Sequence, residues 1–110
     1  MFVIERNNKI KLTIGDTATM LVQIFDLDNK EYEIQADDEI TLTVKKTATS
    51  KDIALTKTAD KDHYIIINSS DTSELATGLY VYDVQLKTKE GFTYTIIPTS
   101  FFQLSSEVSV

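Results

Sequence analysis

The sequence predicts an all-β protein that folds as an antiparallel β-sandwich of about seven to eight strands. Three observations lead to this class. Apolar and polar residues alternate with a period of two, short turn-like segments separate the alternating runs, and no long helical pattern occurs. The chain has 110 residues, below the length at which chains usually divide, so we expect a single domain over residues 1–110. A small β-barrel is the alternative architecture.

Two strands are expected in the first quarter of the chain. Residues 10–14 place three apolar side chains on one face, and residues 18–24 place four on one face after a break at Gly15-Asp16. An acidic segment follows, with a short edge strand over residues 31–34. These runs match half-buried strands, whose successive side chains point to opposite faces.

Three further runs precede the middle turn of the chain. Ile40, Leu42 and Val44 alternate with Thr41, Thr43 and Lys45. Residues 53–58 and 63–68 bracket the polar segment 59–62, which predicts a hairpin between them. In the second of these runs, Ile65 and Ile67 compete with Tyr64 and Ile66 for the core, because a one-sided sheet buries only one set.

Residues 70–75 form the one helix-like segment. Ser70 or Asp71 can cap it, and Glu74 occupies the position of a capping-box acid. Gly78 ends this short turn and leads into a long strand over residues 79–88.

The entry into this strand indicates an immunoglobulin-like sandwich. In such folds, a tyrosine near the start of a strand donates a hydrogen bond back to the corner backbone. Tyr80 or Tyr82 fits that role. Both share a strand face with Val84 and Leu86, and we expect this face to lie in the core.

A hairpin closes the chain. Lys89-Glu90-Gly91 suits a three-residue connection with Gly91 in the left-handed conformation, and residues 92–97 form the partner strand. Phe92 and Tyr94 are expected in the core with the other strand aromatics. Pro98 has no N–H to donate, so it marks a strand end or an edge before a last strand over residues 100–104.

Several of these segments together resemble a family of virion proteins from phages of Gram-positive bacteria. The segments are Gly15-Asp16-Thr17 before an alternating strand, the strand Ile40 to Lys46, Asp71-Thr72 to Leu75 leading into Gly78 to Leu86, and Tyr94 to Pro98 followed by Phe101-Phe102. The family consists of immunoglobulin-like domains similar to the N-terminal domain of the phage baseplate upper protein. The resemblance covers about residues 15–104.

The resemblance implies a non-enzymatic structural part of a phage or prophage particle, in its tail or baseplate. It implies a virion location after assembly in the bacterial cytoplasm, with other virion or tail proteins, or further copies of the chain, as partners. Baseplate upper proteins continue past this domain into receptor-binding parts, whereas this sequence stops at Val110. A small free-standing virion protein and an excised domain both fit this departure.

The composition excludes several other classes. The chain has no cysteine and one histidine, so thiol chemistry, Cys-based metal sites and histidine clusters have almost no residues to use. His63 lies beside Asp62 with serines nearby, but no Gly-x-Ser-x-Gly elbow accompanies them, so we expect no catalytic residues. No secretory leader or membrane span is expected, and no cofactor is predicted.

The net charge of −6 repels nucleic acid and anionic lipid. Residues 26–39 contain seven acids and one base and so carry this whole charge. Asp26, Asp28 and Glu39 are the candidates for a Ca²⁺ site here, although the calcium-loop glycine and spacing are absent. A solvated acidic loop is the favoured interpretation. The alternative function, a carbohydrate- or cell-surface-binding module, would use these loops.

The outward-facing apolar residues are the better functional candidates. If Tyr80 and Tyr82 point inward, Leu79 and Val81 point outward, and if Phe102 points inward, Phe101 does not. A cluster of such side chains on adjacent strands marks a protein interface. We therefore predict an interface around Leu79, Val81 and Phe101.

Overall fold

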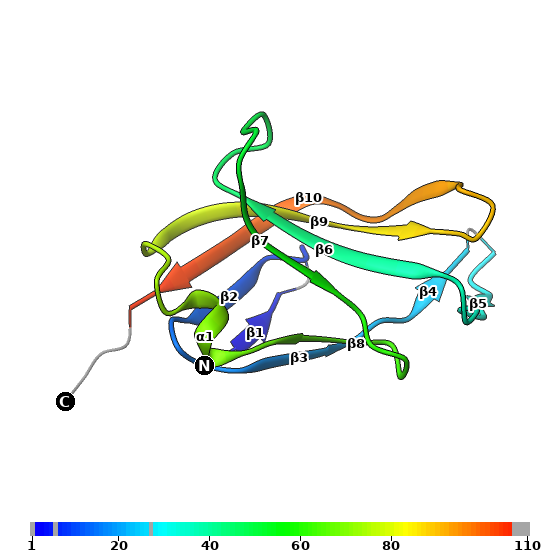
Figure 1. Ribbon diagram of the computed structural model, residues 1–110, viewed down its shortest axis with the longest axis horizontal. Helices are drawn as coiled ribbons and strands as arrows, with labels where there is room; N and C mark the ends of the chain where they lie inside the picture. The colour runs from blue at the N-terminus through cyan, green and yellow to red at the C-terminus, as the bar shows by residue number, and fades with distance from the viewer. Residues whose placement is uncertain (1, 6, 27, 107–110) are drawn as a thin grey trace.

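The computed structural model describes residues 2–5, 7–26 and 28–106, with backbone only at Val3. Within these residues, the chain forms ten strands and one helical turn (Figure 1). The elements are β1 Phe2–Ile4, β2 Ile10–Thr13, β3 Ala18–Leu21, β4 Ile24–Phe25, β5 Glu31–Tyr32, β6 Glu39–Lys45, β7 Ile53–Thr58, β8 Tyr64–Ile67, α1 Ser69–Thr72, β9 Gly78–Lys87 and β10 Thr93–Ser105. The predicted all-β class is confirmed. The count exceeds the expected seven to eight because β1 is also formed and the strand expected over residues 18–24 is divided into β3 and β4. The short strand expected over residues 31–34 is β5, which ends at Tyr32.

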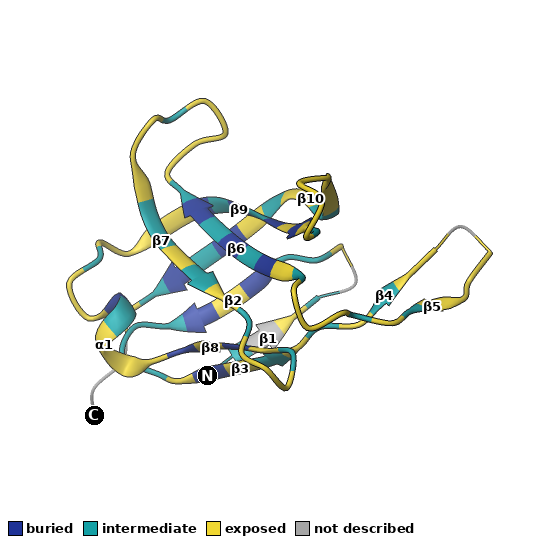
Figure 2. Ribbon diagram, turned by 45° about the vertical axis from the view of Figure 1, so that its right-hand side comes forward, coloured by how far each residue is buried: buried dark blue, intermediate teal, exposed yellow. Residues whose placement is uncertain are grey.

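The strands pair in three sheets. The largest has the order β1-β2-β10-β9-β6-β7, and the pairs β3-β8 and β4-β5 form the others. Within the large sheet, β2 runs parallel to β10, and the other neighbours are antiparallel. β4 and β5 form a short hairpin arm around the start of the acidic segment, and this arm projects from the body of the protein in Figure 2.

One core joins the large sheet to the β3-β8 pair. The buried side chains alternate along β2, β6, β8 and β9, as the sequence pattern predicts. They form a single cluster, in which the dark segments of Figure 2 lie on facing strands: Ile10, Leu12, Ala18, Ile40, Leu42, Val44, Ile65, Ile67, Tyr80, Tyr82, Val84, Leu86, Phe102 and Leu104. Two sheets that share one core are consistent with a sandwich-like fold.

The hairpin expected across residues 59–62 is wrong. β7 pairs with β6 in the large sheet, whereas β8 pairs with β3 in the second layer. Residues 59–62 thus carry the chain from one layer to the other. The crossing lets Ile65 and Ile67 face the core from the opposite side, while Tyr64 and Ile66 point outward.

β10 is one long strand and not two. Pro98 lies inside it, within the register shift between Ile97 and Ser100 in the pairing with β9, and another shift precedes it between Thr95 and Ile97. A bulge tolerates the missing N–H of proline, so the expected strand end is instead an irregularity within the strand. The expected turn before it is confirmed, because Gly91 has a φ of 92° and its N–H donates to the Thr88 carbonyl.

Two tyrosine hydroxyls tie β9 to segments outside the sheet. The Tyr80 hydroxyl donates to the carbonyl of Ala76, at 2.6 Å, which is the corner bond expected of an immunoglobulin-like fold. The Tyr82 hydroxyl donates to the carbonyl of Asn8, 74 residues away in sequence. The corner bond agrees with the immunoglobulin-like prediction, and that assignment itself stays a prediction.

The helical turn α1 is capped differently from the expectation. Its N-cap is Asn68, and the reciprocal acid is Asp71, whose carboxylate accepts the Asn68 N–H at 2.7 Å. Lys57 Nζ lies 2.9 Å from the same carboxylate and, with the Asn68 N–H, holds the pKa of Asp71 below its ordinary value. Among the described residues, no helix has the length and apolar character to cross a membrane.

Thr72 fastens α1 to the turn between β2 and β3. Its side chain is fully buried, and its Oγ1 accepts the Gly15 N–H at 3.0 Å. Gly15 has a φ of 84°, a conformation that favours glycine. This one hydrogen bond joins residues that lie 57 positions apart.

We expect Thr72→Val to lower the free energy of unfolding by about 1–3 kcal/mol, because valine keeps the shape but leaves the Gly15 N–H without its acceptor. Urea denaturation measures the change. Thr58→Val, at an exposed position of β7, is the matched control and should change stability by less than about 0.5 kcal/mol. Equal stability of the Thr72→Val and wild-type proteins would contradict the role of this bond.

Candidate functional site

The three predicted interface residues lie together on the outer face of the large sheet. Phe101 of β10 is directly opposite Val81 of β9, and Leu79 is two residues before Val81 on the same face. Leu79 and Phe101 are each 51% exposed, and Val81 is half-buried. The structure therefore brings these side chains together at the surface.

Ile53 extends this apolar group across the sheet. Lys45 of β6 is opposite Val81 on one side and opposite Ile53 of β7 on the other. Ile53 is 55% exposed. Ile53 is not among the predicted interface residues, because the sequence pattern pairs residues 53–58 with residues 63–68. The observed pairing of β7 with β6 is what places Ile53 near Val81. We name Leu79, Val81, Phe101 and Ile53 the outer apolar patch.

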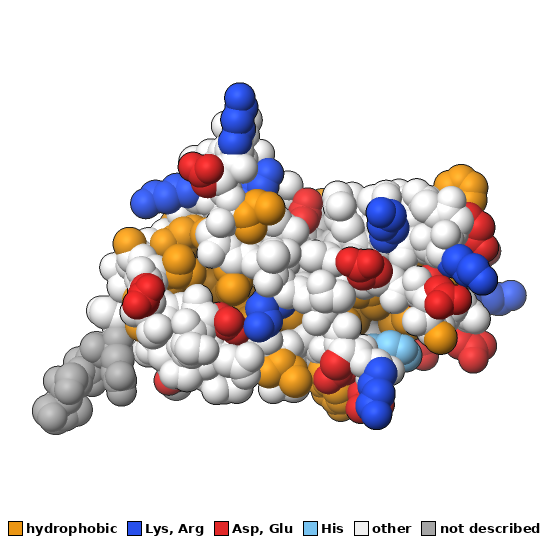
Figure 3. Space-filling model, in the orientation of Figure 1, with side chains coloured by type: hydrophobic (Ala, Val, Ile, Leu, Met, Phe, Trp, Pro, Cys, Tyr) orange, Lys and Arg blue, Asp and Glu red, His pale blue; other side chains and the backbone are white. Residues whose placement is uncertain are grey.

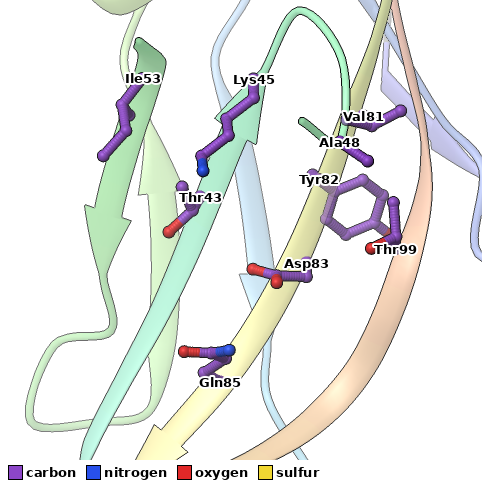
Figure 4. A pocket seen from close by; sticks show the side chains of 9 residues that line it. All are labelled: Thr43, Lys45, Ala48, Ile53, Val81, Tyr82, Asp83, Gln85 and Thr99. Carbon is purple, nitrogen blue, oxygen red and sulfur yellow. The ribbon is translucent and has the colours of Figure 1, made fainter. Parts of the chain in front are cut away.

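A small cavity adjoins the outer apolar patch beside the β6-β7 loop (Figure 4). Its volume is about 240 Å³, and Val81 and Ile53 of the patch line it. Lys45 and Asp83 contribute one charge of each sign, and Thr43 contributes a hydroxyl. The patch thus has a polar border on this side.

The candidate calcium ligands are not brought together. Asp26 Oδ1 instead accepts the N–H groups of Asp28 and Lys30, each at 2.9 Å, within its own hairpin turn. Glu39 lies at the start of β6, opposite Lys87 of β9. Among the described residues, no group of three or more His, Cys, Asp or Glu side chains is arranged to hold a metal ion. Two backbone N–H groups of the loop therefore bind Asp26 Oδ1, an oxygen that a cation would need as a ligand.

The single histidine lies apart from the serines near it in sequence. His63 occupies the turn before β8, with a φ of 70°, and Ser69 begins α1 after the same strand. Six residues of nearly extended chain separate the two by roughly 20 Å. A Ser-His pair of the kind that sequence proximity suggests is therefore not formed.

Two aromatic residues expected in the core are at the surface. Phe92 is 61% exposed and Tyr94 is 55% exposed. Tyr94 is opposite Leu86, so it points to the inner side of the sheet, yet the β3-β8 layer does not reach this end (Figure 1). The alternation predicted the correct face for Tyr94, but the β3-β8 layer does not cover that face at this end of the sheet.

An open groove of about 890 Å³ separates this end of the sheet from the β4-β5 arm. This volume lies within the range of roughly 300–1,000 Å³ that is common for ligand pockets. The groove is lined mainly by apolar and aromatic side chains, which include Ile24, Phe25, Tyr32, Phe92, Tyr94 and Ile97. We name it the aromatic groove. Sequence analysis did not find it, because its two walls lie far apart in the chain.

A hydrogen bond fixes one wall of the aromatic groove. The Tyr32 hydroxyl of β5 donates to Asp38 Oδ2 at 2.6 Å, and this acceptor raises the pKa of Tyr32 to about 12. The same Asp38 oxygen accepts the Gln35 N–H at 2.9 Å. The arm is thereby tied to the segment that enters β6.

We expect Tyr32→Phe to speed amide hydrogen exchange in residues 24–35 about tenfold, because a hydrogen bond to a charged acceptor contributes roughly 1.5–3 kcal/mol. Exchange in β9 should not change. Tyr64→Phe, at an exposed position of β8, is the matched control. Unchanged exchange in the arm of the Tyr32→Phe variant would contradict the role of this bond.

The comparisons with known proteins name no relative of this chain. No protein-family model matches it, and no curated protein matches its sequence.

Proposed function

We propose that this chain is a non-enzymatic interaction module, a structural part of a phage or prophage tail or baseplate that docks on other subunits or on copies of itself. The observation that carries the docking role is the outer apolar patch. Leu79, Phe101 and Ile53 are each at least half exposed, and they lie on neighbouring strands around Val81.

The composition of the patch suits a protein partner. Fully burying one large apolar side chain contributes about 1.5–3 kcal/mol, so a partner surface that covers several gains substantially. Gln103 is opposite Leu79, and Lys11 of β2 is opposite Gln103, so polar side chains border the group formed by Leu79, Val81 and Phe101. Lys45 lies between Val81 and Ile53 and separates Ile53 from that group. An apolar centre with a polar rim is the usual anatomy of an interface.

The phage assignment is supported by the order of motifs from Gly15 to Phe102. The corner bond of Tyr80 adds support, because the resembled domains are immunoglobulin-like and this bond is characteristic of such folds. A particle subunit of this kind acts by position and contact.

A carbohydrate-binding module is the second candidate. The exposed rings of Phe92 and Tyr94 in the aromatic groove favour it, because aromatic faces stack on sugar rings. A metal-dependent form of this function is not proposed, since Asp26, Asp28 and Glu39 do not come together.

For self-association, we expect the solution mass of the wild-type chain to rise above 12.4 kDa with concentration. The double variant Leu79→Thr, Phe101→Thr should stay monomeric, because it removes the two most exposed apolar side chains of β9 and β10 from the patch. Light scattering coupled to size exclusion over a concentration series measures both.

The matched control is the double variant Tyr64→Thr, Ile66→Thr, which changes two partly exposed apolar side chains of β8 in the other layer. It should associate like the wild type. Loss of association in both double variants would contradict the outer apolar patch as the interface. A monomeric wild type at every concentration would assign docking to a different protein.

For the phage assignment, we expect the chain in purified particles. Prophage induction in a strain that encodes the chain, density-gradient purification and quantitative mass spectrometry measure its copy number relative to the major capsid protein. A fixed ratio across preparations is the expected result. Particles that lack the chain would overturn the assignment.

A further inference from the structure

We propose that the aromatic groove binds an extended peptide segment of a partner protein, basic and apolar in composition, which adds as a strand to the unpaired edge of β10. This site is separate from the outer apolar patch. Tyr94 points to the inner side of the sheet, whereas Val81 and Phe101 point to the outer side.

One edge of β10 is unpaired along most of its length. Its partner on one side, β9, pairs with it from Thr93 to Leu104, but β2 on the other side pairs only with Phe102 to Ser105. Among the described residues, no strand pairs with the remaining edge of residues 93–101. Such an edge presents N–H and C=O groups that an added strand can satisfy.

The aromatic groove borders this edge and continues over the inner face of the sheet, where Leu86 of β9 also lines it. Tyr94, Thr95, Ile96 and Ile97 of β10 all line it, and residues 23–26 of the β4 segment line the opposite wall. A strand inserted between these walls would place alternate side chains toward the exposed rings of Phe25, Phe92 and Tyr94. The groove thus offers both main-chain and side-chain contacts to one extended segment.

The charge of the aromatic groove is negative. The charged side chains that line the aromatic groove are Asp26 and Glu90, both acidic. The turn and second strand of the arm belong to the acidic segment 26–39. Figure 3 shows both acidic and basic side chains at this end of the molecule, and Lys89 there lies 3.9 Å from Asp37, outside the lining of the groove. Complementarity therefore favours lysine or arginine in the bound segment.

These features favour a peptide over a glycan. Sugar rings use the aromatic faces but do not satisfy a row of backbone N–H and C=O groups at a strand spacing. Aromatic side chains in a peptide groove serve as large apolar contacts for alternate residues of the added strand.

The test uses a capped synthetic peptide of about seven residues that alternates lysine with valine or isoleucine, titrated into the ¹⁵N-labelled chain. We expect chemical-shift changes in residues 93–97 and 23–26. The double variant Phe92→Ala, Tyr94→Ala should bind about tenfold more weakly. Glu90→Lys should also weaken binding, by about threefold, since it reverses one groove charge.

Two variants and two altered peptides serve as controls. Tyr64→Ala in β8 and Phe101→Thr in the outer apolar patch should bind like the wild type, so failure of the patch as an interface leaves this test intact. A peptide with glutamate in place of lysine should bind more weakly. A peptide N-methylated at alternate residues should lose binding, because it cannot pair with the edge.

Three results would overturn the proposal. The first is no shift at roughly millimolar peptide. The second is equal binding of the N-methylated peptide, which would show that β10 does not pair with it. The third is shifts in the groove with a neutral oligosaccharide such as a chitin fragment but none with the lysine peptide, which would assign the groove to glycans.

Discussion

A β-strand turns successive side chains to opposite faces, and in β9 this constraint determines both the core and the exposed surface of the protein. The strand is central in the large sheet, with β6 on one side and β10 on the other. Its inward residues Tyr80, Tyr82, Val84 and Leu86 occupy the core, so the residues between them must point outward. Leu79 and Val81 are outward for that reason, and the pairing register then adds Phe101 from β10 and Ile53 by way of β6.

The same strand also connects the sheet to the rest of the chain. The rings of Tyr80 and Tyr82 are buried, but their hydroxyls reach polar partners at the core boundary, in the corner after α1 and in the segment before β2. The Tyr82 ring also meets Phe102 edge-on, with centroids 6.3 Å apart, and Lys46 Nζ lies 5.9 Å from the centroid of Tyr80. Phenylalanine at either position would fill the core but would leave the backbone carbonyl of Ala76 or Asn8 without this donor.

Alternation predicted the fold class, the buried set of β6 and β9 and the outward direction of Leu79, Val81 and Phe101, because side-chain direction is a local property of a strand. It did not predict which strands pair. Residues 53–58 and 64–67 are close in sequence, yet they belong to different layers.

The direction of a side chain does not by itself determine whether the side chain is buried. Tyr94 faces inward as expected but remains exposed, since burial requires a second layer whose extent no local pattern encodes. The aromatic groove depends on that missing cover, so sequence reasoning could not locate it.

Pro98 has a consequence for how the protein behaves when crowded. An unpaired strand edge is a template on which further copies can stack into open-ended fibrils. Proline lacks the N–H that each successive copy would need, and the register shift that contains Pro98, together with the one before it, interrupts the regular ladder. The uninterrupted part of the edge is therefore short. An edge of this kind leaves room for one short guest strand, whereas the stacking of further copies along it is disfavoured at Pro98.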